Sequence, residues 1–166
     1  EQAAATGLPP HMLMQRAGLA VARLALALAP HARTIWVACG PGNNGGDGYV
    51  IARLARQGGR DVRVCALVDP AQLSGDAATA WQDFAATGGV LLPFAPDVLA
   101  DAELIIDALL GTGLTRPVTG DFRAAIDAVK KAGGSVKVTG VKAKHVTRKD
   151  RAPGKRAQRR VDSAKK

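Results

Sequence analysis

The chain has 166 residues, of which 47% are hydrophobic and two are cysteines, a composition that allows one domain with a sizeable core and argues against a disulfide framework. No run approaches the roughly 20 apolar residues of a membrane helix, and residues 24–30 follow two arginines, which argues against a signal peptide and favours a cytoplasmic protein without membrane contact. The formal net charge of +9 combines −3 over residues 1–129 with +12 over residues 130–166, so the high pI does not by itself indicate a nucleic-acid-binding protein.

Hydrophobic periodicity predicts helices and strands that alternate along the chain. Apolar residues spaced by three and four predict a helix from Pro10 to Ala29, with Leu24 and Leu28 on its buried stripe. The predicted strands are residues 34–39, 62–68, 90–94 and 104–110, and the later helices are residues 48–58, 75–87 and 121–132, the last with Asp121 as N-cap. This alternation predicts a parallel sheet covered by helices on both sides.

The pattern of helices and strands stops near Gly133. Three valines between residues 136 and 141 allow one more weak strand, and the sequence from Lys142 resembles a solvated, disordered tail. We therefore divide the chain into a globular domain over residues 1–136 and a basic tail over residues 137–166. The tail has no aromatic residues among its lysines and arginines. Two interpretations therefore stay open: a solvated segment without a binding role, and a segment that contacts nucleic acid electrostatically.

The first glycine-rich segment, GPGNNGGDG at residues 40–48, follows a predicted strand and opens a predicted helix. It satisfies G-x-G-x-x-G, and Asp69 lies 24 residues beyond Gly45, so a dinucleotide-binding turn with its amides facing a phosphate is one interpretation. A tight turn that needs glycine dihedral angles is the other. Asp47 would repel a closely bound pyrophosphate, which favours contacts with ribose or ring groups, or acid–base chemistry. Tyr49 would either stack on a base or pack in the core.

The second glycine-rich segment, GTGLTRP at residues 111–117, follows another predicted strand. Ligand sites in open parallel sheets lie beyond the carboxyl ends of the strands, so the two segments meet if the first and fourth strands are neighbours. Asp107 lies within the apolar strand before this segment, where a carboxylate must accept backbone hydrogen bonds or bind a cation or substrate. Oxygen ligands from Asn44 and Asp107 would favour a hard cation over zinc.

The chain resembles the NAD(P)H-hydrate epimerase family, the YjeF N-terminal domain, over roughly residues 1–136. Three segments carry this resemblance: GPGNNGGDGYV, IIDALLGTGLTRPVTG and the earlier LMQRAGLAVA. The resemblance implies a Rossmann-like three-layer α/β/α sandwich with a mainly parallel sheet. It implies an isomerase that interconverts the R and S epimers of the hydrates of NADH and NADPH, called NADHX and NADPHX. An ADP- or ATP-dependent dehydratase domain or protein then restores the cofactor. We also expect a homodimer.

The resemblance also implies roles for individual residues. The family's substrate-binding loops match Asn43, Asn44, Gly45, Gly46, Asp47, Gly111, Thr112, Gly113, Leu114, Thr115, Arg116 and Pro117. Asn44 and Asp107 match ligands of a bound potassium ion, the expected cofactor. Epimerisation of the hydrated ring requires water or proton exchange, and Asp47 is the candidate acid–base group because it is the only carboxylate inside a matched loop.

After the last predicted helix the chain departs from the family. The family continues with a strand and a V-D-I-P-S-G-L motif, whose aspartate contacts the substrate and whose serine completes the potassium site. Those two positions fall near Gly140 and Ala143, whose side chains can do neither. The sequence is therefore compatible with two hypotheses, an active epimerase and an inactive one. Two further hypotheses are a non-catalytic nucleotide- or RNA-binding scaffold of the same fold and a conventional NAD-dependent dehydrogenase.

Overall fold

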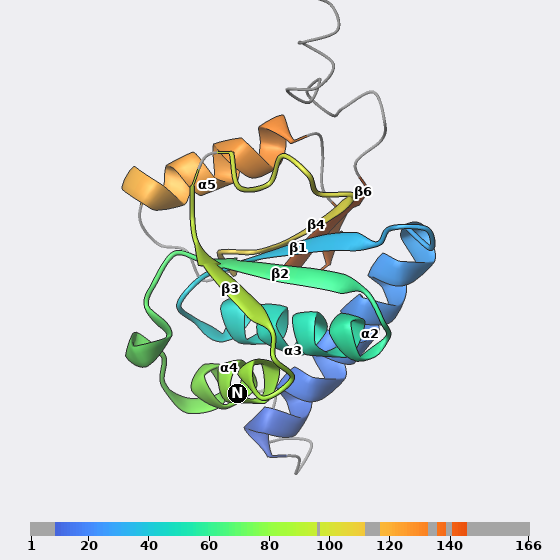
Figure 1. The fold of residues 1–166 in the computed structure, drawn as a ribbon. Helices are drawn as coiled ribbons and strands as arrows, with labels where there is room; N and C mark the ends of the chain where they lie inside the picture. Colours follow the sequence, from blue (N-terminus) through green and yellow to red (C-terminus); the bar gives the residue numbers. More distant parts are fainter. Residues whose placement is uncertain (1–8, 96, 112–116, 133–135, 139–140, 146–166) are drawn as a thin grey trace, which may run out of the picture.

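The computed structural model describes residues 9–95, 97–111, 117–132, 136–138 and 141–145 (Figure 1). Its helices are α2 (Pro10–Leu28), α3 (Asn43–Gln57), α4 (Gly75–Ala85) and α5 (Gly120–Lys131), with a short 3-10 turn η1 (Pro70–Gln72). Its strands are β1 (Thr34–Cys39), β2 (Asp61–Ala66), β3 (Val90–Pro93), β4 (Leu104–Ala108), β5 (Val136–Val138) and β6 (Val141–His145).

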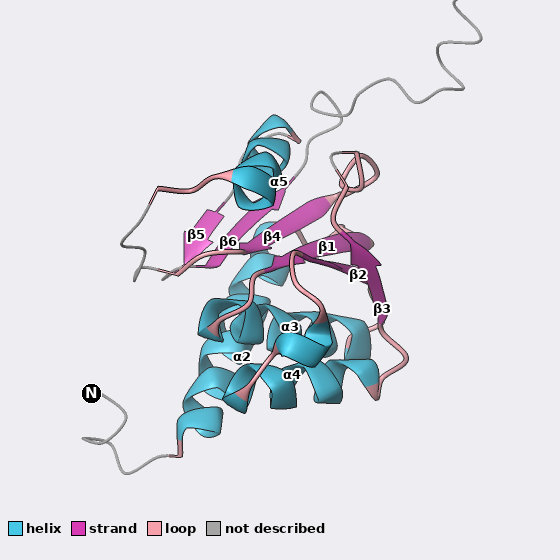
Figure 2. Cartoon of the chain, turned by 90° about the vertical axis from the view of Figure 1, so that its left-hand side faces the viewer, coloured by secondary structure: helices cyan, strands magenta, loops and turns pink. Residues whose placement is uncertain are grey.

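One sheet holds all six of these strands, in the order β3-β2-β1-β4-β6-β5. The first four are parallel, whereas β6 runs antiparallel to both β4 and β5. Every residue of β4 is buried, as is every residue of β1 after Thr34, which is typical of parallel strands covered on both faces. Figure 2 shows α2, α3 and α4 on one face of the sheet and α5 on the other. The predicted three-layer sandwich with a mainly parallel sheet is confirmed.

Helix α2 buries the predicted stripe only in part, because Met14 and Val21 lie in the core as expected whereas Leu24 and Leu28 do not. Leu24 and Leu28 are 41% and 48% exposed, while smaller residues such as Ala22 and Ala25 face the core. Gly18 explains this rotation, because a β-carbon on Gly18 would lie only 2.7 Å from the Val50 β-carbon of α3. Small residues let the two helices approach closely, and the bulky leucines are left outside. No helix in the described part of the chain is long and apolar enough to cross a membrane.

The chain end differs from the single weak strand that the sequence predicts. Val136–Val138 and Val141–His145 form two antiparallel strands that extend the sheet beyond β4. The physical reason is visible in the sequence VKVTGVKAKH, where apolar residues largely alternate with basic ones on either side of a two-residue connection, a typical hairpin pattern. The division of the chain at residue 136 stays a prediction, and the residues after 145 lie outside the description.

Candidate functional site

The two glycine-rich segments lie against each other at one edge of the sheet. The strand order reverses at β1, with β2 and β3 on one side and β4 on the other, and ligands of open α/β sheets bind at such a point. The Gly40 amide donates a 3.1 Å hydrogen bond to the Ala108 carbonyl. A β-carbon on Gly40 would overlap the carbonyl oxygen of Leu109. The predicted neighbourhood of the first and fourth strands is confirmed, and it brings the first segment against the residues just before the second, whose residues 112–116 lie outside the description.

The polar residues of the first segment form the start of a helix and not a loop. Helix α3 begins at Asn43, five residues before the predicted start, with Gly42 as its N-cap and no side-chain cap. The amides of a first helical turn have no partner within the helix and carry its positive dipole end, so they can face an anionic group. Asn43 and Asn44 are therefore held on a rigid element at the edge of the sheet.

Close packing, and not positive φ angles, requires the glycines of α3. The described glycines with positive φ are Gly59, Gly75, Gly88 and Gly120, none of which belongs to this segment, so the dihedral interpretation is wrong. A β-carbon on Gly45 would overlap the Gly40 carbonyl oxygen, and one on Gly48 would lie 2.7 Å from the Ala108 β-carbon. The glycines bring α3 directly onto the ends of β1 and β4.

Asn44 reaches the second segment. Its β-carbon lies 3.7 Å from the position of a β-carbon on Gly111. Its side-chain nitrogen Nδ2 is buried and has no hydrogen-bond partner among the residues that the structure describes. Leaving a buried amide group unpaired costs about 1–3 kcal/mol, so a ligand that pairs with the carboxamide would recover this energy. Turning the carboxamide over would place its oxygen, an acceptor, at the same buried position.

Asp107 is the buried carboxylate of this edge. It is 7% exposed, and its Oδ1 accepts a 3.2 Å hydrogen bond from the Leu109 amide. It stands opposite Ala38 in β1 and opposite Lys142 in the antiparallel pairing with β6. Within the described ranges no group of three acidic, histidine or cysteine side chains could hold a metal. A cation here would therefore depend on neutral oxygens as well as on Asp107.

Asp47, the fifth residue of α3, has a perturbed acidity. It is half-buried, and this burial raises the pKa of its carboxyl from 3.8 to about 6. In the described part of the chain no hydrogen bond or ion pair to its side chain is present. A carboxyl group with a pKa near the working pH populates both protonation states, which suits proton transfer.

The remaining predicted site residues are only partly placed. Gly111 and Pro117 bound the second segment and are exposed, whereas Thr112, Gly113, Leu114, Thr115 and Arg116 lie outside the described residues, as does Gly140. Ala143 stands opposite Ile106 of β4 and Val136 of β5. Whether the second segment contributes side chains to this edge stays a prediction.

Tyr49 packs in the core and does not offer its ring to a ligand. It is fully buried and makes an edge-to-face contact with Trp81, with 5.5 Å between ring centroids, beside Phe84. Its hydroxyl is buried without a hydrogen-bond partner. The two cysteines are also buried and unpaired, and burial raises the pKa of the Cys65 thiol to about 12. The side chains of Tyr49 and of the two cysteines therefore belong to the core and are not part of the candidate site.

Replacing Tyr49 with phenylalanine is expected to raise the free energy of unfolding by about 1 kcal/mol, because the ring contacts stay while an unpaired buried hydroxyl is removed. Urea unfolding followed by far-ultraviolet circular dichroism measures the change. Tyr49→Leu is the matched control, which should destabilise the fold by removing the aromatic contacts. A loss of stability in Tyr49→Phe would contradict an unpaired hydroxyl.

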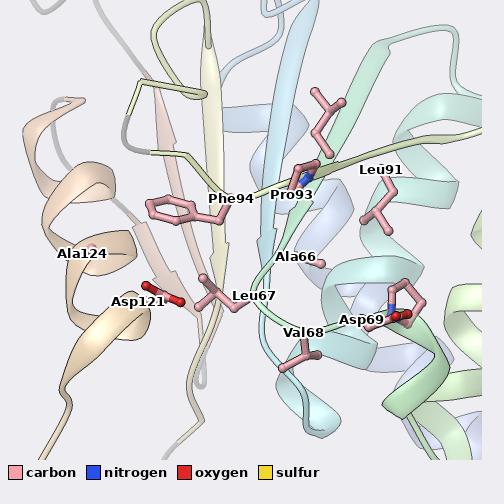
Figure 3. Close-up of a pocket in the computed structure, with 11 residues that line it drawn as sticks. Ala66, Leu67, Val68, Asp69, Leu91, Pro93, Phe94, Asp121 and Ala124 are labelled. Carbon is pink, nitrogen blue, oxygen red and sulfur yellow. The ribbon is translucent and has the colours of Figure 1, made fainter.

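A cleft of about 540 Å³ opens at the same sheet edge, between the ends of β2 and β3 and the start of α5 (Figure 3). It is lined by Ala66, Leu67, Val68, Asp69, Pro70, Leu91, Leu92, Pro93, Phe94, Asp121 and Ala124. None of the predicted site residues that the structure describes lines it. Asp121, predicted as the N-cap of α5, lies instead in the first turn behind the N-cap Thr119. The sequence signals this cleft only through Asp69 at a strand end.

Known proteins resemble this chain in both sequence and fold. Residues 10–143 match the family described as YjeF-related protein N-terminus. The chain is 44% identical over 118 residues to an NAD(P)H-hydrate epimerase of Bordetella pertussis, covering 70% of this chain and 50% of that protein. It is 43% identical over 128 residues to a bifunctional NAD(P)H-hydrate repair enzyme Nnr of Coxiella burnetii, covering 77% of this chain and 26% of that protein. It thus spans half or less of the length of these two relatives.

The fold comparison agrees. The crystal structure of yeast ynu0 superposes with a TM-score of 0.65 at 22% sequence identity, covering 75% of this chain and 57% of the yeast chain. This likeness independently supports the Rossmann-like arrangement of helices and strands described above.

Proposed function

We propose that this chain, which belongs to the YjeF-related protein N-terminus family, interconverts the R and S epimers of the hydrates of NADH and NADPH. The observation that carries the proposal is the approach of Asn44 to Gly111, which brings both glycine-rich segments to the point where the strand order reverses. The similarity to a relative named NAD(P)H-hydrate epimerase supplies the reaction.

In this proposal three parts of the chain act together. The free amides at the start of α3 face the substrate and donate to its ribose or ring groups, because Asp47 beside them would repel a closely bound pyrophosphate. Asp47, with its pKa of about 6, donates a proton to the departing hydroxyl group as water leaves the hydrated ring and takes a proton back as water adds again. The rigid packing of α3 on β1 and β4 keeps Asp47 in place relative to the second segment.

Asn44 and Asp107 fit the expected potassium ion. Both offer hard oxygen ligands. In Asn44 the carboxamide would have to turn over, which brings its oxygen to the buried position where Nδ2 now has no partner among the described residues. When bound, the ion would supply positive charge beside the negatively charged substrate. We further propose that the chain acts together with a dehydratase domain or protein, that it forms a homodimer and that it is located in the cytoplasm. The Coxiella relative named as bifunctional supports the first of these.

Epimerisation of purified R-NADHX, followed by chromatography with a protein-free control, tests this function. We expect interconversion faster than the spontaneous rate. A folded sample that leaves the epimer ratio at the protein-free value would reject the activity. That result would favour the non-catalytic scaffold of the same fold.

Potassium dependence is the second expected result. Replacing potassium with lithium should slow the reaction, and Asp107→Asn should raise the potassium concentration needed for half-maximal rate by about tenfold, because one charged ligand is lost. Asp83→Asn, an exposed aspartate of α4, is the control of equal charge change. Equal potassium curves for Asp107→Asn and the unaltered chain would show that Asp107 is no ligand.

A second candidate function rests on the +12 charge of residues 130–166. In this case the domain is a scaffold that binds RNA through its basic end. Electrostatic binding would weaken steeply with added salt and be lost on removing residues 146–166, which leaves β5 and β6 intact. Salt-insensitive or absent binding would reject it.

A further inference from the structure

The cleft between β2, β3 and α5 exists because this part of the sheet has no helix over it. On this face α5 is the only described helix, and the connection from β3 to β4 covers the rest with turns that bury Leu99 and Ala102 (Figures 1 and 2). The space left open has the size typical of small-molecule sites, at about 540 Å³. It faces the same edge as the site described above.

The walls of the cleft define the chemistry of an occupant. Leu67, Leu91 and Phe94 give it apolar, half-buried sides. Asp69 and Asp121 are its charged residues, and no basic residue is among the described residues that line it. A phosphate would be repelled by two carboxylates, whereas a flat apolar body with hydroxyl or amino donors would be attracted. A nucleoside whose 2′ and 3′ hydroxyls carry no phosphate has this chemistry.

Asp69 is held in position for such a contact. Its Oδ1 accepts a 2.9 Å hydrogen bond from the Ala71 amide, which caps η1 and fixes the carboxylate just beyond the end of β2. Figure 3 shows Asp69 and Asp121 on opposite sides of the cleft, one from the sheet and one from α5. In other dinucleotide-binding sheets an acidic residue after the second strand accepts from a ribose hydroxyl.

The place of the cleft matches the shape of a dinucleotide, and this step rests on the proposed function. The substrate has two nucleosides joined by a pyrophosphate. The reacting ring must lie near Asp47 and Asn44, and the pyrophosphate then extends from it along the carboxyl ends of the strands, away from Asp47. The second nucleoside then needs its own place on this edge. The cleft begins one strand away, and neighbouring strands are about 4.8 Å apart.

We propose that the cleft binds the adenosine end of the substrate, with Asp69 and Asp121 accepting hydrogen bonds from the ribose hydroxyls or the adenine amino group. These carboxylates disfavour a phosphate on the ribose 2′ oxygen. The chain therefore binds the hydrate of NADH in preference to the hydrate of NADPH.

Two probes that need no turnover test this inference: AMP, and adenosine 2′,5′-bisphosphate. Titrations of the full chain are followed by calorimetry and by amide NMR shifts at Leu67 and Val68. The unaltered chain should bind AMP more tightly. Asp69→Asn and Asp121→Asn should each lower the ratio of the bisphosphate's Kd to the Kd of AMP by about fivefold. This is the upper end of the effect of an exposed pair of charges. Asparagine at residue 69 can still accept from the Ala71 amide, so the cap stays.

Matched variants separate the cleft from general effects. Asp83→Asn, on the other face of the sheet, changes the net charge equally and should leave the preference unchanged. Ala124→Leu places a larger side chain at an exposed position of α5 that lines the cleft, and should weaken AMP binding. Leucine suits a helix, and thermal unfolding confirms that each variant is folded.

The outcomes distinguish the two proposals. AMP binding at the cleft without epimerisation would reject the proposed activity and keep the nucleoside site. A second result would overturn only the proposal that the cleft binds adenosine. In that result the chain epimerises NADHX and NADPHX at equal rates, and AMP causes no NMR shifts at Leu67 and Val68. Tighter binding of the bisphosphate to the unaltered chain would also overturn it.

Discussion

Replacing Gly45 with alanine is expected to lower the free energy of unfolding by about 3 kcal/mol or more, the upper range for overpacking. The added β-carbon would overlap the Gly40 carbonyl oxygen, so backbone would meet backbone. No flexible side chain can move aside to relieve this contact. The start of α3 would have to shift away from β1 and β4, and epimerase activity should fall with stability.

Gly42→Ala is the control for this prediction. A β-carbon on Gly42 meets nothing within 4 Å, and φ at this residue is −100°, which alanine adopts freely. The change should cost less than about 1 kcal/mol, the loss of a favourable N-cap residue. Urea unfolding of both variants measures the difference. Equal stabilities would show that α3 does not sit as closely on the sheet as described.

Asp47→Asn should have opposite effects on stability and activity. Burial raises the pKa of this carboxyl from 3.8 to about 6, so the folded state prefers the protonated form and is penalised by ionisation. Stability from this group is full below pH 4 and is lost as the pH rises through 6. Removing the charge should therefore stabilise the fold at pH 7 by about 1–3 kcal/mol. Activity should fall by about 10²- to 10⁴-fold, the usual contribution of acid–base catalysis.

Unfolding by urea between pH 4 and pH 8 checks the stability arm of this prediction. The curves of Asp47→Asn and the unaltered chain should coincide at pH 4 and separate toward pH 7. Asp83→Asn, whose side chain is exposed, should show no such separation. If Asp47→Asn gains stability but keeps full activity, Asp47 has no role in proton transfer and is only a half-buried acid.

Much of this architecture follows from local pattern in the sequence. The sequence predicts strand β1 with its observed bounds because a run of β-branched and aromatic residues is followed by glycine. The meeting of the glycine-rich segments follows from the rule that sites lie where strand order reverses. Neither prediction needs knowledge of side-chain contacts.

The misses come from contacts between distant residues. Asparagine and glycine are poor helix formers, so the sequence marks residues 43–47 as a loop, but close packing of Gly45 and Gly48 against the sheet makes them helical. The cleft could not be predicted either, since its walls come from three segments that are separated by 20 residues or more. Only the folded sheet brings Asp69 and Asp121 to one opening.

Strand β6 reverses the direction in which the chain leaves the sheet. Lys142 stands opposite Asp107, at the candidate site, whereas His145 stands opposite Leu104, at the other end of β4. A parallel strand in this position would deliver its following residues to the candidate site. Here the exit point lies one strand length away, roughly 16 Å for five residues. The described chain therefore reaches His145 at the end of β4 that lies opposite Asp107 and the candidate site.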